Sequence, residues 1–394
     1  MSSQMSDTLT PRRHVANVRP APAFAVLGAR SWGTTLGAAL QRGGCRVTVW
    51  TRRADMAHAI ETARHNRRHL PGIRLPQGMR AGIDIASVVE NVDGVMLAVP
   101  STASRAVARC AAPWLTADTP VLAVCKGIEH VSGALRTQVL QEEPGDEALT
   151  GVIAGPSFAD EVARGLPTRL TLAMRALSAP LPVAPPTHAF ADMLCQALHG
   201  AGVALERTDD VIGVQIGGAL KNMIAIACGM ATAQGMGENA RAAIVSRGLD
   251  DMRRLTLALG GRSDTLFCCS GVGDLFLTAA STHSRNTRLG LRLGRGESAD
   301  ELSELAEGAL SSQSVQVLER RLGLQLRVPR AVRDVLARRV HVGRALQRLL
   351  HDELDPAASQ ATRHATLTVS GGRLAHDPTT LRLNAPHRLQ RAAQ

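Results

Sequence analysis

Short runs of apolar residues recur along the first half of the chain, separated by longer mixed segments. The runs cover residues 24–27, 47–50, 95–99, 121–125 and 152–154. Each is too short for a core helix and suits a strand that is buried on both faces, as in parallel sheets. The segments between them are long enough for helical crossovers. The pattern therefore predicts an α/β domain with a doubly wound, mainly parallel sheet.

The pattern changes after about residue 210. Residues 212–259 and 301–350 are rich in Ala, Leu, Met and Arg, with apolar positions at helical spacing and few β-branched runs. Such segments favour helices over strands. We therefore expect an all-α domain to follow the α/β domain.

A glycine-containing turn lies between the first predicted strand and a helix expected over residues 34–42. Gly28 and Gly33 occupy the first and third positions of the dinucleotide-binding fingerprint G-x-G-x-x-G, after a strand and at the start of a helix. N–H groups at such a helix N-terminus bind a diphosphate. The middle position, which usually holds glycine, is Arg30. Its guanidinium either attracts the phosphates or obstructs the cofactor.

The pattern and the glycine turn together divide the chain into four parts. We predict a flexible tail over 1–22, a dinucleotide-binding α/β domain over 23–208, a helical domain over 209–352 and a poorly ordered basic tail over 353–394.

The end of the second predicted strand bears on the choice of cofactor. NAD sites place Asp or Glu about 20 residues after the glycines, where the carboxylate binds the ribose 2′-hydroxyl. Here Arg52 and Arg53 follow the strand, and Asp55 comes slightly later. Guanidinium groups suit a 2′-phosphate, so we favour NADP over NAD. The alternative interpretation is a solvated basic turn.

Lysine is almost absent from this chain. Of the 45 basic residues only two are lysine, Lys126 and Lys221. Lys126 follows the apolar run 121–125, at the carboxyl edge of the sheet where α/β proteins bind ligands. Lys221 lies in an apolar helical stretch, where burial disfavours the ammonium form and makes a general acid or base near neutral pH. We predict functional roles for both, in preference to two surface lysines.

Two polar segments in the second half of the chain add candidate groups. Asp274 lies in a glycine-rich segment that we interpret as a turn. Ser284, Arg285 and Asn286 combine a hydroxyl, a guanidinium and an amide. This set suits a bidentate grip on phosphate. Each segment also suits a helix cap or a simple turn.

Charge and cysteine content narrow the class of protein. The formal charge is +11, but more than half of the excess lies in residues 1–20 and 357–394, and aromatic residues are scarce. We therefore expect no specific nucleic-acid partner. No apolar run approaches the ~18 residues of a membrane span. Seven cysteines without metal-site spacing indicate reduced thiols, no bound metal and a cytoplasmic protein, with an arginine-rich transit peptide as the alternative.

Taken in order, the motifs resemble those of one family. The segments are Gly-Ala-Arg-Ser-Trp-Gly-Thr (28–34), Leu-Ala-Val-Pro-Ser (97–101), Cys-Lys-Gly-Ile-Glu (125–129), Ala-Gly-Pro-Ser-Phe-Ala (154–159), Gly-Gly-Ala-Leu-Lys-Asn (217–222) and Ser-Arg-Asn (284–286). Asn66, His-Leu-Pro-Gly (69–72), Gly-Asp (273–274) and Glu-Gly (307–308) fit the same order. The series resembles bacterial-type NAD(P)-dependent glycerol-3-phosphate dehydrogenase from about residue 24 to residue 350. The linked series is specific, although no single motif is.

The resemblance implies a Rossmann domain followed by an all-helical substrate domain. The implied reaction is the reversible reduction of dihydroxyacetone phosphate to sn-glycerol 3-phosphate for glycerophospholipid synthesis. The implied cofactor is NADP or NAD, and the implied assembly is a homodimer. Lys221 resembles the family's proton acceptor, with Lys126 and Asp274 as further catalytic residues.

The resemblance also assigns binding residues. Those implied for the cofactor are Gly28, Ser31, Trp32, Gly33, Arg52, Arg53, Lys126, Ala159, Arg285, Leu305 and Glu307. Those implied for the substrate are Lys126, Gly155, Ser157, Lys221, Asp274, Ser284, Arg285 and Asn286.

Two other interpretations stay open at this point. One is a related β-hydroxyacid or ketopantoate-type reductase, which would also use a lysine but gives no reason for the 284–286 segment. The other is a catalytically impaired paralogue in which Arg30 has weakened cofactor binding.

Overall fold

The computed structural model describes residues 20–145, 148–175, 186–297 and 307–351. By its internal contacts the chain divides into a unit of Met1–Leu350 and a short unit of His351–Gln394, and the described residues belong almost entirely to the first. The tail predicted over 353–394, most of the tail predicted over 1–22, and Leu305 lie outside the described residues.

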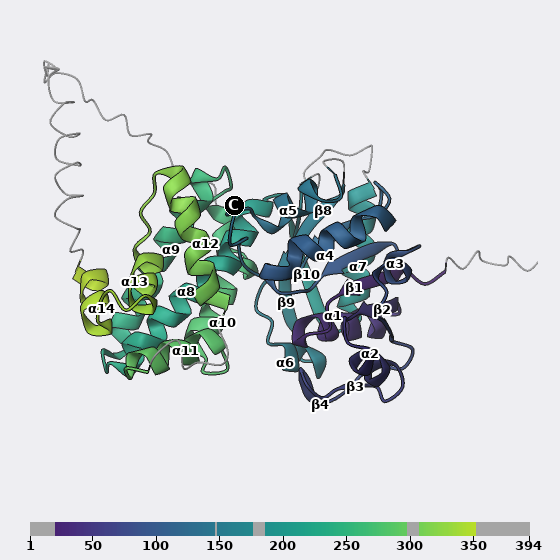
Figure 1. The fold of residues 1–394 in the computed structure, drawn as a ribbon, viewed down its shortest axis with the longest axis horizontal. Helices are drawn as coiled ribbons and strands as arrows, with labels where there is room; N and C mark the ends of the chain where they lie inside the picture. The colour runs from purple at the N-terminus through teal and green to yellow at the C-terminus, as the bar shows by residue number, and fades with distance from the viewer. Residues whose placement is uncertain (1–19, 146–147, 176–185, 298–306, 352–394) are drawn as a thin grey trace, which may run out of the picture. The chain divides into compact units, whose positions relative to one another are not determined.

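A sheet of eight strands forms the first part of the described chain (Figure 1). Its strands lie in the order β10, β9, β8, β7, β6, β1, β2, β5. Their bounds are β1 (Ala23–Leu27), β2 (Arg46–Trp50), β5 (Arg80–Gly82), β6 (Gly94–Leu97), β7 (Val121–Ala123), β8 (Thr150–Ala154), β9 (Thr168–Met174) and β10 (Val203–Thr208). Neighbours run parallel except β8 and β9, which are antiparallel. The predicted doubly wound, mainly parallel sheet is confirmed.

Helices cover both faces of this sheet. Their bounds are α1 (Ser31–Arg42), α2 (Ala54–Glu61), α3 (Ile85–Val89), α4 (Ser104–Ala111), α5 (Arg136–Glu142), α6 (Ala159–Ala163) and α7 (Pro186–His199). Along β1, Phe24 and Val26 pack into the hydrophobic cluster that includes α1 and α7. Ala25 and Leu27 pack into the cluster that includes α3, α4 and α5. Burial on both faces explains why the strand is apolar at every position.

The strand order reverses between β1 and β6. From β1 the chain adds β2 and β5 on one side, and then returns to add β6, β7 and β8 on the other. Open α/β sheets bind ligands at the carboxyl ends of the strands beside such a reversal. The residues that follow β1, β6 and β7 therefore meet where a ligand is expected.

Some predicted bounds were wrong by a few residues. The helix α1 begins at Ser31 rather than at residue 34, because Arg30 takes the extended N-cap conformation (φ −75°, ψ −179°) and Gly33 falls inside the first turn. β6 ends at Leu97 and β7 at Ala123, two residues before the apolar runs end. The runs continue because Val99 and Val124 stay buried after the chain has left the strand.

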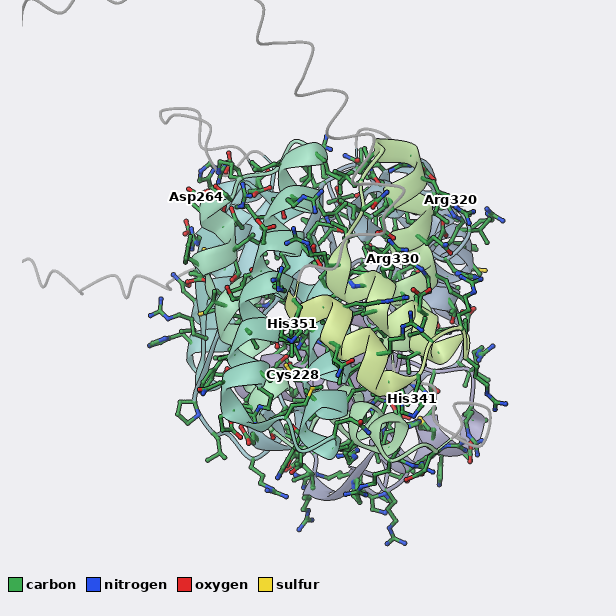
Figure 2. The ribbon with its side chains drawn as sticks, turned by 90° about the vertical axis from the view of Figure 1, so that its left-hand side faces the viewer. Cys228, Asp264, Arg320, Arg330, His341 and His351 are labelled. Atoms are coloured by element: carbon green, nitrogen blue, oxygen red, sulfur yellow. The ribbon has the colours of Figure 1, made fainter. Side chains whose placement is uncertain are left out.

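The second part of the chain is helical, as predicted. Its elements are α8 (Val211–Ala233), α9 (Gly237–Ala258), the 3-10 turn Asp264–Phe267, the π-helical turn Cys269–Gly273, α10 (Asp274–Ala280), α11 (Arg285–Gly294), α12 (Glu307–Leu322), α13 (Arg327–Leu336) and α14 (Val342–His351). Figure 2 views this part, with the exposed Arg320 at its edge. Asp274 is thus the first residue of a helix after a π-helical turn, and not part of a simple glycine turn.

The helix α8 is the core of the helical part. It is apolar on nearly every side, and 20 of its 23 residues are buried. Asp210 caps it by accepting hydrogen bonds from the N–H groups of Ile212 (3.1 Å) and Gly213 (2.9 Å). Among the described helices it alone is long and apolar enough to cross a membrane. Inside the protein 94% of its apolar window is buried, as expected of a core helix.

Candidate active site

The turn between β1 and α1 has two glycines, and any other residue at either position would force the neighbouring main chain to move. Gly28 has φ +126°, and a Cβ there would lie 2.9 Å from main-chain atoms of Ala98 and Val99, which follow β6. A Cβ on Gly33 would lie 2.0 Å from the carbonyl oxygen of Gly28. The turn therefore packs main chain against main chain at the strand reversal. A dinucleotide-binding turn has the same requirement.

The middle position of the turn accepts a side chain without strain. Arg30 has ordinary extended dihedrals and is exposed. The backbone of this turn therefore accommodates arginine at the position where the fingerprint usually has glycine. Asn66, in the hairpin of β3 (His65–Asn66) and β4 (Leu70–Arg74), braces the turn by donating to the carbonyl of Ala29 (2.8 Å) and to Thr34 (2.9 Å). With α1 presenting its first N–H groups here, the residues fit the diphosphate of a dinucleotide.

Both lysines of the chain meet at one buried carboxylate. The Asp274 side chain is fully buried, and its Oδ2 lies 2.7 Å from Nζ of Lys126. Its Oδ1 accepts a hydrogen bond from Nζ of Lys221. Lys126 also donates to the carbonyl of Gly155 (3.2 Å), the residue after β8. The structure thus brings Lys126, Lys221, Asp274 and Gly155 together, and Ser157 joins them by donating to the same Gly155 carbonyl (3.0 Å).

The two lysines differ in their affinity for a proton. Burial lowers the pKa of Lys221 to about 7; the attraction of Asp274 opposes this shift, and the nearby charge of Lys126 adds to it. Burial also acts to lower the pKa of Lys126, but the Asp274 charge and hydrogen bond outweigh it, so the pKa of Lys126 is raised. The pattern is Lys126 as an ammonium paired with Asp274, beside an amine that exchanges a proton near neutral pH.

Thr278 completes this group, and the sequence analysis missed it. Its hydroxyl accepts a hydrogen bond from Nζ of Lys221 (2.8 Å) and donates one to the carbonyl of Asp274 (2.7 Å). The sequence feature that could have identified it is its position four residues after Asp274, which places both side chains on the same face of α10. It fixes the direction in which the Lys221 amine points.

Arginines from both parts of the chain gather around His69. Its carbonyl accepts a hydrogen bond from the Ser31 hydroxyl at the start of α1 (2.6 Å). Burial lowers the pKa of His69, and nearby positive charges lower it further; these charges belong to Arg30, Arg68, Arg53 and Arg285. An exposed arginine at the start of α11, Arg285, therefore acts on the same group as arginines of the glycine turn and of the end of β2. Such a cluster attracts phosphate groups.

The neighbours of Arg285 have structural partners. Ser284 caps α11 by accepting from the N–H of Thr287 (3.3 Å). Asn286 is buried, donates to Oδ1 of Asn222 (2.9 Å) and accepts from the N–H of Gly308 (3.0 Å). Asn286 therefore joins α8, α11 and α12 with both ends of its amide. Of the three residues 284–286, Arg285 is the one whose charged group is exposed.

The remaining predicted cofactor residues that the structure describes come from several elements. Trp32 is half-buried and packs against the hydrophobic cluster under α1. Ala159 begins α6 and accepts a hydrogen bond from Thr35 of α1 (2.9 Å). Arg52 and Arg53 are exposed, and Arg53 pairs with Asp55 (2.5 Å). Glu307 begins α12, and its charge acts on Lys126. Among the described residues, no three His, Cys, Asp or Glu side chains form a group that can hold a metal ion.

Comparison with known proteins covers both parts of the chain. The sequence model of the NAD-dependent glycerol-3-phosphate dehydrogenase N-terminus matches residues 23–179, and that of the C-terminus of the same enzyme matches residues 210–347. A glycerol-3-phosphate dehydrogenase [NAD(P)+] of Stenotrophomonas maltophilia is 38% identical over 337 residues, which cover 84% of this chain and 96% of that protein.

Solved structures agree in fold. The crystal structure of glycerol-3-phosphate dehydrogenase from Coxiella burnetii has a TM-score of 0.77 and 33% identity, over 84% of this chain and 99% of that one. A ketopantoate reductase from Ralstonia eutropha has a TM-score of 0.51 at 18% identity, over 83% of this chain and 99% of that one, a likeness of fold alone.

Proposed function

This chain belongs to the NAD-dependent glycerol-3-phosphate dehydrogenase family, and from that premise we propose how its residues carry out the reaction. It interconverts dihydroxyacetone phosphate and sn-glycerol 3-phosphate with NAD(P), and so supplies glycerophospholipid synthesis. The observation that carries the proposal is the buried group of Lys221, Asp274 and Lys126. The ketopantoate reductase shares the fold at 18% identity, whereas the glycerol-3-phosphate dehydrogenase of Stenotrophomonas maltophilia is 38% identical.

Lys221 is the residue that exchanges a proton with the substrate oxygen. When bound, the nicotinamide supplies the hydride for reduction or takes it up in oxidation. During reduction the Lys221 ammonium protonates the developing alkoxide, and during oxidation the neutral amine accepts the hydroxyl proton. A pKa near neutrality makes both forms available at working pH. Thr278 and Asp274 hold the amine by hydrogen bonds and so set its orientation.

Lys126 and Asp274 provide fixed charge beside that proton. The Lys126 ammonium lies at the carboxyl end of β7, where it can polarise the substrate carbonyl. Asp274 neutralises this ammonium and keeps the site from accumulating two unpaired positive charges. Gly155 and Ser157 support Lys126 from the end of β8.

Arginine supplies the grip on the phosphates. Arg285 binds the substrate phosphate, since it is an exposed guanidinium at the helical side of the site. Ser284 and Asn286 shape the start of α11 that presents it. For the cofactor, the residues that hold it are Gly28, Ser31, Trp32, Gly33, Arg52, Arg53, Ala159, Leu305 and Glu307. Arg52 and Arg53 stand where NAD enzymes carry an acid, which supports a preference for NADP.

The free cysteines and two exposed phenylalanines bear on location and assembly. All seven cysteines are free thiols, which supports a reducing, cytoplasmic location. Phe267 and Phe276 are 82% and 74% exposed on the helical part, which supports a homodimer that covers them. Sedimentation of the purified protein tests the second point: a monomer at all concentrations would contradict it.

Oxidation of NADPH with dihydroxyacetone phosphate, followed by absorbance, tests the reaction. We expect turnover that is faster with NADPH than with NADH, and a Lys221→Arg variant that loses about 10²–10⁴-fold in kcat because arginine does not release a proton. Arg320→Lys, at an exposed position of α12, is the control and keeps normal turnover. A folded protein without turnover supports the impaired paralogue instead. Turnover with ketopantoate but not with dihydroxyacetone phosphate supports the related reductase.

A further inference from the structure

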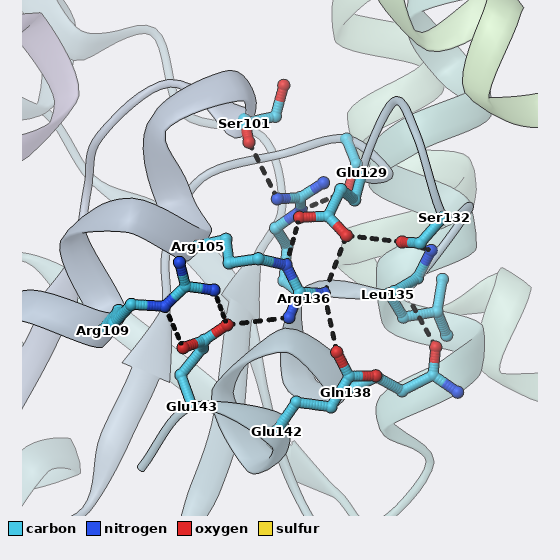
Figure 3. Close-up of polar contacts among 12 residues, drawn as sticks. Ser101, Arg105, Arg109, Glu129, Ser132, Leu135, Arg136, Gln138, Glu142 and Glu143 are labelled. Carbon is cyan, nitrogen blue, oxygen red and sulfur yellow. Dashed lines mark hydrogen bonds and ion pairs between the residues drawn. The ribbon is translucent and has the colours of Figure 1, made fainter. Parts of the chain in front are cut away.

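A fully buried arginine lies behind the loop that carries Lys126. Arg136 is 1% exposed and is the first residue of α5. Its Nε donates to the carbonyl of Gly127 (3.1 Å), the residue directly after Lys126. Its Nη1 donates to the carbonyl of Ser101 (3.0 Å), in the turn after β6. The guanidinium therefore bridges the loops that leave two adjacent strands, β6 and β7 (Figure 3).

This position is costly for a positive charge. Burial lowers the pKa of Arg136, which reflects the loss of water around the guanidinium. Within the described residues its Nη2 has no hydrogen-bond partner. A cation at the first residue of a helix also faces the positive end of the helix dipole. Helix formation and packing alone would favour an apolar residue at position 136. The contribution that only the arginine makes is its pair of hydrogen bonds to the carbonyls of Gly127 and Ser101.

A second arginine ties the same loop from the surface. Arg105 of α4 makes two hydrogen bonds of 2.8 Å to the carboxylate of Glu129, three residues after Lys126. The side chains of Arg105 and Glu129 are 26% and 15% exposed. This pairing lowers the pKa of Glu129 to about 2. The loop from Lys126 to Glu129 is therefore held at two points to the segment that follows β6.

We propose that Arg136 is a positioning residue of the proton-transfer site, which holds the Lys126 main chain so that the Lys126 ammonium stays against Asp274. The inference rests on the proposed function, in which Lys221 exchanges a proton with the substrate oxygen. Without the bridge the carbonyls of Gly127 and Ser101 lose their common partner, and the loop is free to move Lys126 away from Asp274.

The expected consequence concerns the charge of Lys221. The groups that act on this amine are Asp274, which favours the ammonium, and Lys126, which disfavours it. The further charges around Lys126 and Arg136 belong to Glu307, Glu129 and Arg105. The Cys125 thiol also lies near Arg136, and burial raises its pKa. When Lys126 withdraws, Asp274 is left with Lys221 as its only ammonium. The pKa of Lys221 then rises, and the pH profile of turnover moves toward alkaline pH.

The chain offers a direct readout, because it contains two lysines. Protein labelled with [ε-13C]lysine gives two side-chain signals, which Lys126→Arg and Lys221→Arg variants assign. Titration of these signals without substrate or cofactor follows each amine separately. The variants are Arg136→Met, which removes the bridge and the charge, and Arg136→Lys, which keeps the charge but cannot reach both carbonyls. Arg136→Lys adds a third lysine signal, and combining it with Lys126→Arg or Lys221→Arg assigns all three signals. Arg109→Met is the control, since Arg109 pairs with Glu143 and does not touch the loop.

We expect both Arg136 variants to raise the Lys221 midpoint by about one pH unit and to lower kcat on the order of 10- to 100-fold, with KM little changed. The control keeps the wild-type midpoint and kcat. Folded Arg136 variants with an unchanged midpoint overturn the proposal. The proposal is also overturned if Arg136→Lys keeps the wild-type Lys221 midpoint while Arg136→Met shifts it, since the charge at position 136 and not the bridge would then matter. If Arg136→Met does not fold, Arg136→Lys decides by the same readouts. Lack of turnover in the wild type would refute the proposed function but leave the lysine titration as a test.

Discussion

Replacing Lys221 by methionine tests the lowered pKa through stability rather than turnover. Lys221 is 5% exposed in the middle of α8, and methionine keeps an unbranched stem of similar length. In the folded protein burial lowers the pKa to about 7, whereas in the unfolded chain it has its ordinary value of 10.5. Between these values the unfolded chain carries an ammonium where the folded chain carries an amine.

The sign of the effect follows from this difference in bound protons. Because the unfolded state binds one more proton, the free energy of unfolding rises with pH by about 1.4 kcal/mol per unit in that interval. The stability that the neutral Lys221 amine allows is fully present above the ordinary lysine pKa of 10.5. It is lost as pH falls toward the pKa of about 7 that Lys221 has in the folded protein. Lys126 has a raised pKa, so it acts in the opposite direction and only above the ordinary lysine value. From about pH 7 to about pH 9, Lys221 should add about 3 kcal/mol to the wild type.

Urea unfolding of the wild type and Lys221→Met across this pH range, under reducing conditions, measures the effect. The cysteines titrate in both proteins and cancel in the difference, and the chain has no tyrosine. We expect the variant to be the more stable protein near neutral pH and to lose that advantage by about 1.4 kcal/mol for each pH unit. A difference that stays constant with pH would refute the reasoning, because Lys221 would then hold its proton in the folded state.

Three further substitutions have definite expectations. Gly33→Ala places a Cβ 2.0 Å from the carbonyl oxygen of Gly28, so we expect weaker NADPH binding by calorimetry and a loss of stability on the order of 1–3 kcal/mol; unchanged binding would contradict the tight turn. Arg285→Gln should raise KM for dihydroxyacetone phosphate by about tenfold or more, as loss of a charged hydrogen bond predicts, with a smaller change in kcat; an unaltered KM would remove Arg285 from the phosphate site. Burial raises the pKa of Asp251 to about 6, so wild-type stability should fall as pH rises from about 4 to about 6, and Asp251→Asn should flatten this part of the urea-unfolding profile; an equal slope in both proteins would count against the buried proton.

Local pattern predicted the elements that position the site. The apolar runs gave β1, β6, β7 and β8, because these strands are buried at every position. In β2 buried Val47 and Val49 alternate with less buried residues, and this alternation also favours a strand. The glycine turn could be predicted from the sequence because Gly28 and Gly33 pack against main chain and leave no room for a side chain. The exact strand ends were not predictable, because Val99 and Val124 remain buried after they leave the sheet.

The contact of both lysines with one carboxylate could not be predicted from the sequence. The apolar surroundings of Lys221 predicted that burial would lower its pKa, and the structure agrees. The sharing of Asp274 with Lys126 depends on packing between segments far apart in the chain, which no spacing encodes. Arg136 was missed for a related reason. In a chain so rich in arginine, one guanidinium buried at a helix start looks in the sequence like any exposed one.

The scarcity of lysine also determines how the chain responds to a protease that cuts after lysine. Cleavage can occur after Lys126 and Lys221 alone, and would give the fragments 1–126, 127–221 and 222–394. The side chains at these two points are 19% and 6% exposed, and both contact Asp274. The folded protein should resist such an enzyme while one that cuts after arginine attacks the surface. The rate of lysine-specific digestion would therefore report how often the site itself opens, and ligands that close it should slow the cut.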